Sequence, residues 1–428
     1  MREWYLTVYL EQNKLIPIYQ SAYRKNYSTE TAILDVLSHV YKYVDSGDVT
    51  LLGLLDLSSA FDCVDHHTLL NRLQRAYGFT GQALDWFTSF LDERKLVVSF
   101  NGRTSRSASL DSGVPQGSVL GSLLFVLYTA DVQNIAHRCG FNIQSYADDT
   151  QLLGHCTPSL INNFVDKLIC CINDINRWMS SNFLKLNSDK TQLLMLGTQY
   201  RLKIINVNPV YINGSHIVLQ QSAVDLGVTI DSELTMQPHI KSIVKSCSYQ
   251  LRQLWSIRKC ITTVVAKTLA QSFVCSKIDY CNSILYGVSQ TNLRCLQSVL
   301  NGAARFVTQR RKFDHISHVM RDDLHWLPIS QRIEFKICSF TYKCIHGLAP
   351  SYLMNYCVGV SSDGGRSRLR SAVRGDLVVP RVKSTLGSRS FAVAGPKLWN
   401  SLPCSMRDPS LSFDIFRKML KTHLFRIE

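Results

Sequence analysis

Two adjacent aspartates interrupt an apolar segment in the first half of the chain. Residues 141–154 read FNIQSYADDTQLLG, with apolar residues on both sides of Asp148 and Asp149. Neighbouring carboxylates repel each other, and burial of an unpaired carboxylate is strongly unfavourable. The segment therefore predicts a β-hairpin with the two acids at its tip.

Three interpretations of this acidic pair are open from these residues alone. Aspartate is common in turns, so the pair could simply shape the tip of the hairpin. It could also be a surface charge pair without a role. Alternatively, a divalent cation, which prefers hard oxygen ligands, would offset the repulsion between the two carboxylates.

A metal site that clamps a phosphoryl group needs carboxylates from more than one segment. Residues 50–61, TLLGLLDLSSAF, open as an apolar run that predicts a buried strand with Asp56 at its end. The apolar and glycine residues before Asp56 weaken the alternative of a cap or turn role. Asp62 and Asp65 follow in the expected turn and helix start, and we interpret both as structural.

Two further features are typical of a nucleotide site. GVPQGS (113–118) is a loop of small residues around Gln116 that enters an apolar helix, and a helix N-terminus favours anions. Lys190, in NSDKTQLL, heads a predicted strand beside the hairpin, where it could touch a phosphate or donate a proton to leaving pyrophosphate. The alternative is an exposed lysine at a strand start.

The charge balance favours a polyanionic partner. The 428 residues include 47 Lys and Arg against 32 Asp and Glu, a formal net charge of +15, and 46% of the residues are hydrophobic. The hydrophobic content excludes a disordered chain. A basic excess suits nucleic acid or an anionic membrane. Because no helix has the basic amphipathic face of a membrane binder, we expect nucleic acid and no membrane.

The sequence carries no sign of export. The N-terminus, MREWYLTVYLEQNK, lacks the apolar core of a signal peptide, so the 14 cysteines are expected to stay reduced. The longest apolar run, residues 118–130, is too short to span a bilayer and predicts a buried helix. We expect an intracellular protein of the nucleus or the cytoplasm, without a transmembrane segment.

The spacing of apolar residues divides the chain into two patterns. Strands and helices alternate in mixed order over residues 50–231, which predicts an α+β core, an antiparallel sheet packed on one face by helices. Residues 235–355 are mostly helical with repeated Lys and Arg, and residues 361–390 read as a solvated basic loop. The individual predictions are helices at 28–46, 66–78, 81–94, 159–182 and 412–425, hairpins at 95–110, 141–154 and 211–220, and strands at 190–197 and 223–231.

The order of these motifs resembles reverse transcriptases, and more narrowly those of non-LTR (LINE-type) retrotransposons of the jockey or chicken-repeat branch. The resemblance covers about residues 20–235 as the polymerase core, and the tail also looks similar. It rests on LLDLSSAFDCVDH, SGVPQGSVLG, YADD, LNSDKTQLL and LGVTID in the core, QSAYRKNYSTETAIL before it, and HWLPISQRIEFK, GLAPSYL and GPKLWNSLP after it.

The resemblance implies a right-hand polymerase fold. Residues 1–49 would form partial fingers and an N-terminal helical segment, and residues 50–233 the palm with inserted fingers elements. Residues 234–310 would form a helical thumb. Residues 311–428 would be a helical and irregular C-terminal region of the retrotransposon type, with a basic loop near 361–390.

The resemblance also implies roles for the acidic residues. Asp56 and Asp148 would be direct metal ligands, assisted by the backbone carbonyl of Leu57. Asp149 would be the third carboxylate, closer to the primer end. Phe61, five residues after Asp56, falls where the family places a bulky gate against the sugar 2′-hydroxyl.

Further roles concern the substrates. By the same resemblance, Gln116 and Gly117 would position the incoming nucleotide and the template, and Lys190 would be the general acid. The LGVTID strand would be the primer grip. The implied cofactor is a pair of Mg²⁺ ions, or Mn²⁺ in their place, and the implied partners are an RNA template, a DNA primer and deoxynucleoside triphosphates.

Some parts of the family pattern are missing from this sequence. Complete elements carry an endonuclease ahead of the polymerase, and the family has fingers strands with triphosphate-binding basic residues before the QSAYRKN stretch. We therefore expect a 5′-truncated element or a partial gene. The expected function is RNA-directed DNA polymerisation. The alternative is a catalytically inactive remnant that only binds nucleic acid, whereas Phe61 disfavours an RNA-templated RNA polymerase.

Overall fold

The computed structural model describes residues 3–212, 214–362 and 374–426. Contacts within the chain divide it into two compact units. Unit 1 comprises Met1–Lys25, Leu51–Leu194 and Ile205–Gln220, and unit 2 comprises Asn26–Thr50, Met195–Ile204 and Gln221–Glu428. Residues 363–373 of the predicted basic loop lie outside the described residues. The four-part division into fingers, palm, thumb and C-terminal region stays a prediction.

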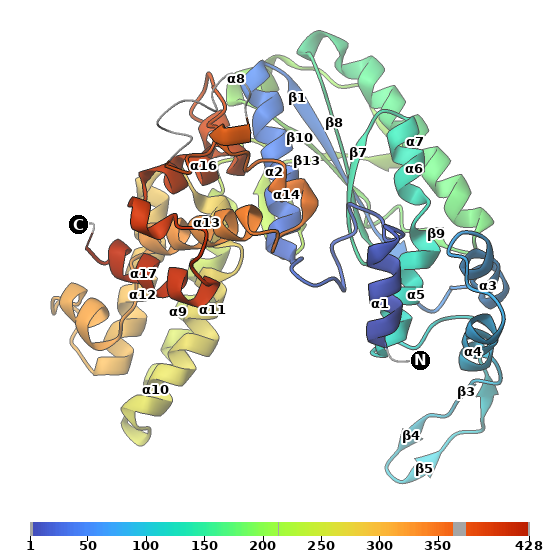
Figure 1. The fold of residues 1–428 in the computed structure, drawn as a ribbon, viewed down its shortest axis with the longest axis horizontal. Coiled ribbons are helices and arrows are strands. Elements are labelled where there is room, and N and C mark those ends of the chain that lie inside the picture. The colour runs from blue at the N-terminus through green and yellow to red at the C-terminus, as the bar shows by residue number, and fades with distance from the viewer. Residues whose placement is uncertain (1–2, 213, 363–373, 427–428) are drawn as a thin grey trace. The chain divides into compact units, whose positions relative to one another are not determined.

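A five-stranded sheet forms the centre of unit 1 (Figure 1). Its spatial order is β13-β10-β1-β8-β7, with bounds Leu219–Gln220, Gln192–Leu196, Val49–Leu55, Asp149–Cys156 and Asn142–Tyr146. β7 and β8 are antiparallel and form the predicted hairpin, with Tyr146 opposite Asp149 at its tip. The α+β class is therefore confirmed, and β1 lies directly beside β8.

One edge of this sheet differs from the prediction. β10 and β13 are parallel, with Leu193 opposite Leu219, so the predicted antiparallel sheet is wrong at this edge. A parallel pair needs a long connection that returns the chain to the same end of the sheet. Residues 197–218 supply that connection. The hairpin predicted at 211–220 lies within it, as β11 (Val210–Ile212) and β12 (Ser215–Ile217).

The apolar composition of β1 explains its central place. All but one of its residues are buried, so both of its faces are covered. The sequence predicted helices on one face of the sheet alone, and β1 is therefore more enclosed than expected. Gly53 allows close packing, because a Cβ there would lie 3.2 Å from Cδ2 of Leu193. The predicted helix at 159–182 is α7 (Ile161–Ser181), which contacts β8. Its buried side chains recur with helical spacing at Val165, Leu168, Ile172, Ile175 and Met179.

Local signals account for the elements around the sheet. α3 (His66–Arg75) begins after Asp65, whose carboxylate accepts a hydrogen bond from the Thr68 N–H at 2.7 Å, which confirms the structural interpretation of Asp65. β4 (Ser99–Phe100) and β5 (Arg103–Thr104) form the predicted hairpin around an Asn-Gly turn. The other elements of unit 1 are α1 (Glu3–Gln12), α4 (Gln82–Leu91), α6 (Val132–Arg138), β2 (Leu57–Ser58), β3 (Lys95–Leu96), β6 (Ala108–Ser109), β9 (Lys185–Leu186) and η1 (Pro158–Leu160).

The apolar run at 118–130 forms α5 (Val119–Thr129). The Ser118 hydroxyl caps this helix by accepting a hydrogen bond from the Gly121 N–H. Its residues from Leu123 to Tyr128 are buried, so the prediction of a buried helix is confirmed. Within the described part of the chain, one helical stretch, Val119–Arg138, has the length and hydropathy of a membrane span by composition alone, and 61% of its apolar window is buried inside the protein.

Unit 2 is mainly helical, which confirms the prediction for residues 235–355. α2 (Thr29–Ser46) begins with a capping box between Ser28 and Thr31 and ends at Gly47, which has a φ of +106°. The other α-helices are α8 (Gln199–Ile204), α9 (Gln237–Ile257), α10 (Thr263–Ala270), α11 (Ser276–Asp279), α12 (Gln290–Thr308), α13 (Ile329–Ile345), α14 (Ser351–Met354), α16 (Phe391–Ser401) and α17 (Phe413–Leu424). Shorter 3-10 or π turns are η2 (Arg258–Cys260), η3 (Gln271–Cys275), η4 (Asn282–Leu285), η5 (Val319–Asp323), η6 (Val360–Ser362), η7 (Gly387–Arg389) and η8 (Cys404–Met406).

Two predictions in unit 2 are wrong. The single strand predicted at 223–231 is a hairpin of β14 (Ser222–Asp225) and β15 (Val228–Asp231), because Leu226 and Gly227 both have positive φ and form a two-residue turn. The end of the predicted solvated loop is also anchored. The Asp45 carboxylate accepts hydrogen bonds from the backbone N–H groups of Lys383 and Ser384, and the Arg389 guanidinium lies over the Tyr41 ring.

A buried acid in α2 predicts a pH-dependent stability. Asp35 is 4% exposed, and burial raises its pKa to about 7 although Tyr356 donates a hydrogen bond to it. Because this pKa exceeds the unfolded value near 4, the contribution of Asp35 is fully present below about pH 4 and is lost as the pH rises through about 7. We expect Asp35→Asn to raise the free energy of unfolding at pH 8 by on the order of 2–4 kcal/mol, and much less at pH 5.

Urea denaturation at the two pH values measures this difference. Asp166→Asn, at an exposed position on α7, is the matched control and should change little at either pH. An equal effect of Asp35→Asn at pH 5 and pH 8 would contradict the assignment of Asp35 as a buried, protonated acid.

Candidate active site

The end of β1 and the tip of the β7–β8 hairpin hold three aspartates. Asp56 directly follows β1, Asp148 lies in the turn of the hairpin, and Asp149 opens β8. Asp56 and Asp148 are partly buried, while Asp149 is exposed. Since β1 and β8 are neighbours in the sheet, the sheet order brings together the three acids that the sequence singled out.

The three carboxylates repel one another. Burial, followed by repulsion from Asp56, raises the pKa of Asp148, while its own backbone N–H and the Lys190 ammonium oppose this shift. Burial, followed by repulsion from Asp148 and then Asp56, raises the pKa of Asp149. The site therefore holds more negative charge than its surroundings neutralise.

Residues 185–190 contact both the backbone and the side chain of Asp56. The Asp56 carbonyl accepts a hydrogen bond from the Asn187 N–H at 2.9 Å, next to the antiparallel pair of β2 and β9. The Lys190 Nζ lies 3.4 Å from Oδ2 of Asp56, and the side chain of Lys190 is 68% exposed. The prediction that the strand after Lys190 lies beside the hairpin is wrong, because β1 separates β10 from the hairpin in the sheet. The Lys190 ammonium is nevertheless near enough to Asp148 at the hairpin tip to oppose the shift of its pKa.

Two apolar site candidates also lie near the end of β1. Leu57 is buried and pairs with Leu186 of β9. Phe61 is partly buried, and its ring stacks on Phe125 of α5 with 4.5 Å between centroids and 29° between planes. The stacking fixes the Phe61 ring while part of it remains accessible.

The Gly/Pro loop before α5 is held by the turn that follows β2. The Gln116 Nε2 donates a hydrogen bond to Oδ1 of Asp62 at 3.0 Å. Gly113 has a φ of +88°, and a Cβ there would lie 3.0 Å from the Asp62 backbone, so only glycine suits this close approach. Gly117 is exposed, with a φ of +77°. Asp62 is thus structural, as interpreted, and also positions Gln116.

Gln20 is a positioning residue that the sequence analysis missed. Its buried carboxamide binds both backbone groups of Ala147 in the acidic turn, donating to the carbonyl at 3.2 Å and accepting from the N–H at 3.0 Å. Ala147 has a φ of +57°, an uncommon conformation that these bonds stabilise. Ser21 adds a backbone bond to Ser145 of β7. Its sequence signal is its place at the start of the QSAYRKN stretch, which by itself indicates no role for this side chain.

The three carboxylates offer the oxygen ligands that a divalent cation prefers, although they are not arranged as a complete metal site. Among the described residues, no group of three or more His, Cys, Asp or Glu is arranged to hold a metal ion. Asp56 Oδ2 is nevertheless buried and accepts no hydrogen bond, although the exposed Lys190 ammonium lies 3.4 Å away, and the three carboxylates repel one another. A divalent cation would satisfy this oxygen and offset the repulsion.

A comparison with protein families covers the segments that carry these acids. The profile of the family described as "Reverse transcriptase (RNA-dependent DNA polymerase)" matches residues 4–230, more than half of the chain. The chain belongs to the reverse transcriptase family. That span contains every residue of the candidate site, and it confirms the predicted resemblance to reverse transcriptases.

Relatives in Drosophila melanogaster indicate the branch of the family to which the chain is similar. The chain is 26% identical over 311 residues to "Probable RNA-directed DNA polymerase from transposon BS", covering 70% of this chain and 33% of the relative. It is 27% identical over 250 residues to "RNA-directed DNA polymerase from mobile element jockey", covering 57% of this chain and 26% of the relative. The predicted jockey-like, non-LTR branch is thereby confirmed. The chain spans about a third or less of the length of these relatives.

A solved structure shows a weaker likeness. A chain in "Structure of telomerase from Candida albicans in complexe with TWJ fragment of telomeric RNA" aligns with 71% of this chain and 51% of its own length. The sequence identity is 12% and the TM-score is 0.35, so this alignment places no residue of the site.

Removal of the Gln20 carboxamide should destabilise the acidic turn. Gln20→Ala leaves the partly buried N–H and carbonyl of Ala147 without these partners, and we expect the free energy of unfolding to fall by about 2–4 kcal/mol. Urea denaturation measures the change. Gln82→Ala, at an exposed position, is the control and should have little effect. If both variants unfold alike, Gln20 does not hold the turn.

Proposed function

We propose that this chain is the RNA-directed DNA polymerase of a jockey-like retrotransposon. It would add deoxynucleotides to the 3′-hydroxyl of a DNA primer along an RNA template. The observation that carries the proposal is the meeting of Asp56, Asp148 and Asp149 at the end of β1, in a chain of the reverse transcriptase family. Phosphoryl transfer depends mainly on positioning and charge stabilisation, which such a site provides.

In this proposal the acidic residues hold the cofactor. Asp56 and Asp148, with the backbone carbonyl of Leu57, bind Mg²⁺, or Mn²⁺ in its place, and Asp149 is the third carboxylate. Two such ions, when bound, lower the pKa of the primer 3′-hydroxyl and stabilise the charge of departing pyrophosphate. The buried Oδ2 of Asp56 that accepts no hydrogen bond supports this assignment.

In this proposal Lys190 and Gln116 contact the substrates. Lys190 neutralises part of the Asp56 charge in the free enzyme and donates a proton to the leaving pyrophosphate. The amide nitrogen of Gln116 is engaged by Asp62, so its oxygen is left to orient the nucleotide or template. Gly117, with no heavy atom within 4 Å of a Cβ position, lets these ligands approach the backbone closely.

The remaining assignments concern the larger parts of the chain. We propose that residues 1–49 belong to the fingers and that the β14–β15 hairpin is the primer grip. The helices of residues 234–310 would form the thumb, with their Lys and Arg following the template–primer backbone. The site of action would be the nucleus or the cytoplasm.

Loss of one metal-binding carboxylate should abolish polymerisation. We expect Asp148→Asn to reduce primer extension on poly(rA)–oligo(dT) with Mg²⁺ by about 10²–10³-fold or more, because one charged ligand is removed without a change of shape. Asp166→Asn should retain activity. If the parent chain binds the template–primer but does not extend it, the chain is an inactive nucleic-acid binder and the proposal fails.

Reduction of the Phe61 side chain should relax sugar selection. Phe61→Val opens space beside the expected 2′ position, and we expect the relative use of ribonucleotides to rise about tenfold or more. Phe100→Val, at a 75% exposed position on β4, is the control and should leave selection unchanged. Unchanged selection in an active Phe61→Val enzyme would rule out Phe61 as the gate.

A further inference from the structure

A basic cleft in unit 2 shares no lining residue with the acidic site of unit 1. It contains about 1040 Å³ of empty space open to solvent. Four of its lining residues are cations, Arg332 and Lys336 on α13 and Arg417 and Lys421 on α17, against the single carboxylate of Asp279. All of them lie beyond residue 230, outside the span that matches the reverse transcriptase family.

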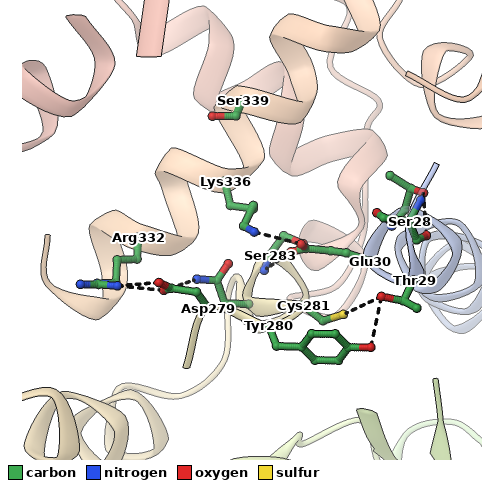
Figure 2. Close-up of polar contacts among 12 residues, drawn as sticks. Ser28, Thr29, Glu30, Asp279, Tyr280, Cys281, Ser283, Arg332, Lys336 and Ser339 are labelled. Carbon is green, nitrogen blue, oxygen red and sulfur yellow. Dashed lines mark hydrogen bonds and ion pairs between the residues drawn. The ribbon is translucent and has the colours of Figure 1, made fainter. Parts of the chain in front are cut away.

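The two cations of α13 are fixed by acidic partners (Figure 2). The Arg332 guanidinium donates two hydrogen bonds to the Asp279 carboxylate, at 2.7 and 3.0 Å, and its Nε donates to the Leu327 carbonyl. The Lys336 Nζ lies 3.1 Å from Oε2 of Glu30, which is 7% exposed. These two cations are therefore held in place with their charges largely compensated.

The two cations of α17 lack such partners. In the described ranges, neither Arg417 nor Lys421 has a carboxylate within ion-pair distance, and Arg417 instead lies 5.5 Å from the Phe413 ring centroid. Burial, followed by repulsion from Arg332, Lys267 and Arg417, lowers the pKa of Lys421. No acidic group opposes this shift, so the cleft carries an uncompensated positive charge.

We propose that this cleft binds the phosphate groups of a single nucleic-acid strand. An anion between α13 and α17 would supply the charge that Arg417 and Lys421 lack, and basic residues beside aromatic ones are typical of strand-binding surfaces. Trp326, which is 5% exposed, and the partly buried Phe335 form part of the apolar wall of the same cleft.

The arrangement favours a strand over a free phosphate ion. Each helix contributes two cations four residues apart, which places the two side chains of a pair one helical turn apart on one face. The row of α17, Arg417 and Lys421, is uncompensated and can follow consecutive phosphates of a strand, while the fixed Arg332 and Lys336 line the same cleft. One inorganic phosphate would contact only part of this row. The net charge of +15 favours a long polyanion over an isolated acidic peptide.

The test compares two lysines on the same helix. Lys421→Glu and Lys418→Glu make the same change of charge, but Lys418 does not line the cleft. Binding of a fluorescent oligo(U) strand to the full chain is followed by anisotropy over a range of salt concentrations, without metal or nucleotides. Both lysines are exposed, so α17 should keep its packing through Phe416, Leu420 and Leu424, which thermal melts check.

We expect Lys421→Glu to weaken binding about fivefold or more near 0.1 M salt and to reduce the slope of log K against log salt by about 0.7. Lys418→Glu should change the affinity less than about twofold. Arg417→Glu should resemble Lys421→Glu. Asp166→Asn, at an exposed position outside the proposed catalytic site, should bind the strand like the parent. Because the assay contains neither metal nor nucleotides, its result does not depend on whether the proposed polymerase activity holds.

Three results would overturn the proposal. Equal affinities of Lys421→Glu and Lys418→Glu for the strand would show that the cleft does not bind it. Binding of inorganic phosphate that depends on Lys421, without any difference in strand affinity, would assign the cleft to a free phosphate ion. Tighter binding of a polyglutamate peptide than of oligo(U) at equal salt would assign it to an acidic protein segment.

Discussion

Repulsion among three carboxylates at the end of β1 is the constraint on which the arrangement of unit 1 depends. Asp148 and Asp149 would move away from Asp56 if the hairpin tip were free. Hydrogen bonds from Gln20 to the turn, and from Asn187 to the Asp56 carbonyl, hold the backbone on both sides. The fold thus maintains an electrostatically unfavourable cluster, which suits a site that gains its stability when a cation is bound.

Local patterns in the sequence predicted most elements and the identity of the acids. The hairpin with Asp148, the strand that ends at Asp56 and the helix capped at Ser28 all follow from short-range signals. The predictions that are wrong or missing concern contacts between segments far apart in the sequence, or a turn with a weak sequence signature. The parallel pairing of β10 with β13 and the separation of β10 from the hairpin by β1 depend on strand order, which periodicity does not reveal. The Leu-Gly turn at 226–227 lacks the usual Asn-Gly signature, and the partner of Gln20 lies 127 residues away.

The acidic site of unit 1 and the basic cleft of unit 2 carry excess charge of opposite sign. In unit 1, a single exposed lysine, Lys190, approaches an excess of carboxylates. In unit 2, Glu30 and Asp279 compensate the charges of Lys336 and Arg332 on α13. Among the described residues, Arg417 and Lys421 on α17 have no carboxylate within ion-pair distance. In each case some of the charge is fixed by a neighbouring group and the rest is available to a ligand of opposite sign.

The bond between Gln20 and the acidic turn also bears on the order of folding. An isolated hairpin can form within about 1–10 μs, but closure of a segment of 127 residues carries a loop entropy that only extensive packing offsets. The strands β7 and β8 can therefore pair without Gln20, whereas the Gln20 bonds that stabilise the left-handed conformation at Ala147 require the N-terminal segment to pack against the hairpin. A chain that lost this packing would keep all three aspartates but not this support for their geometry.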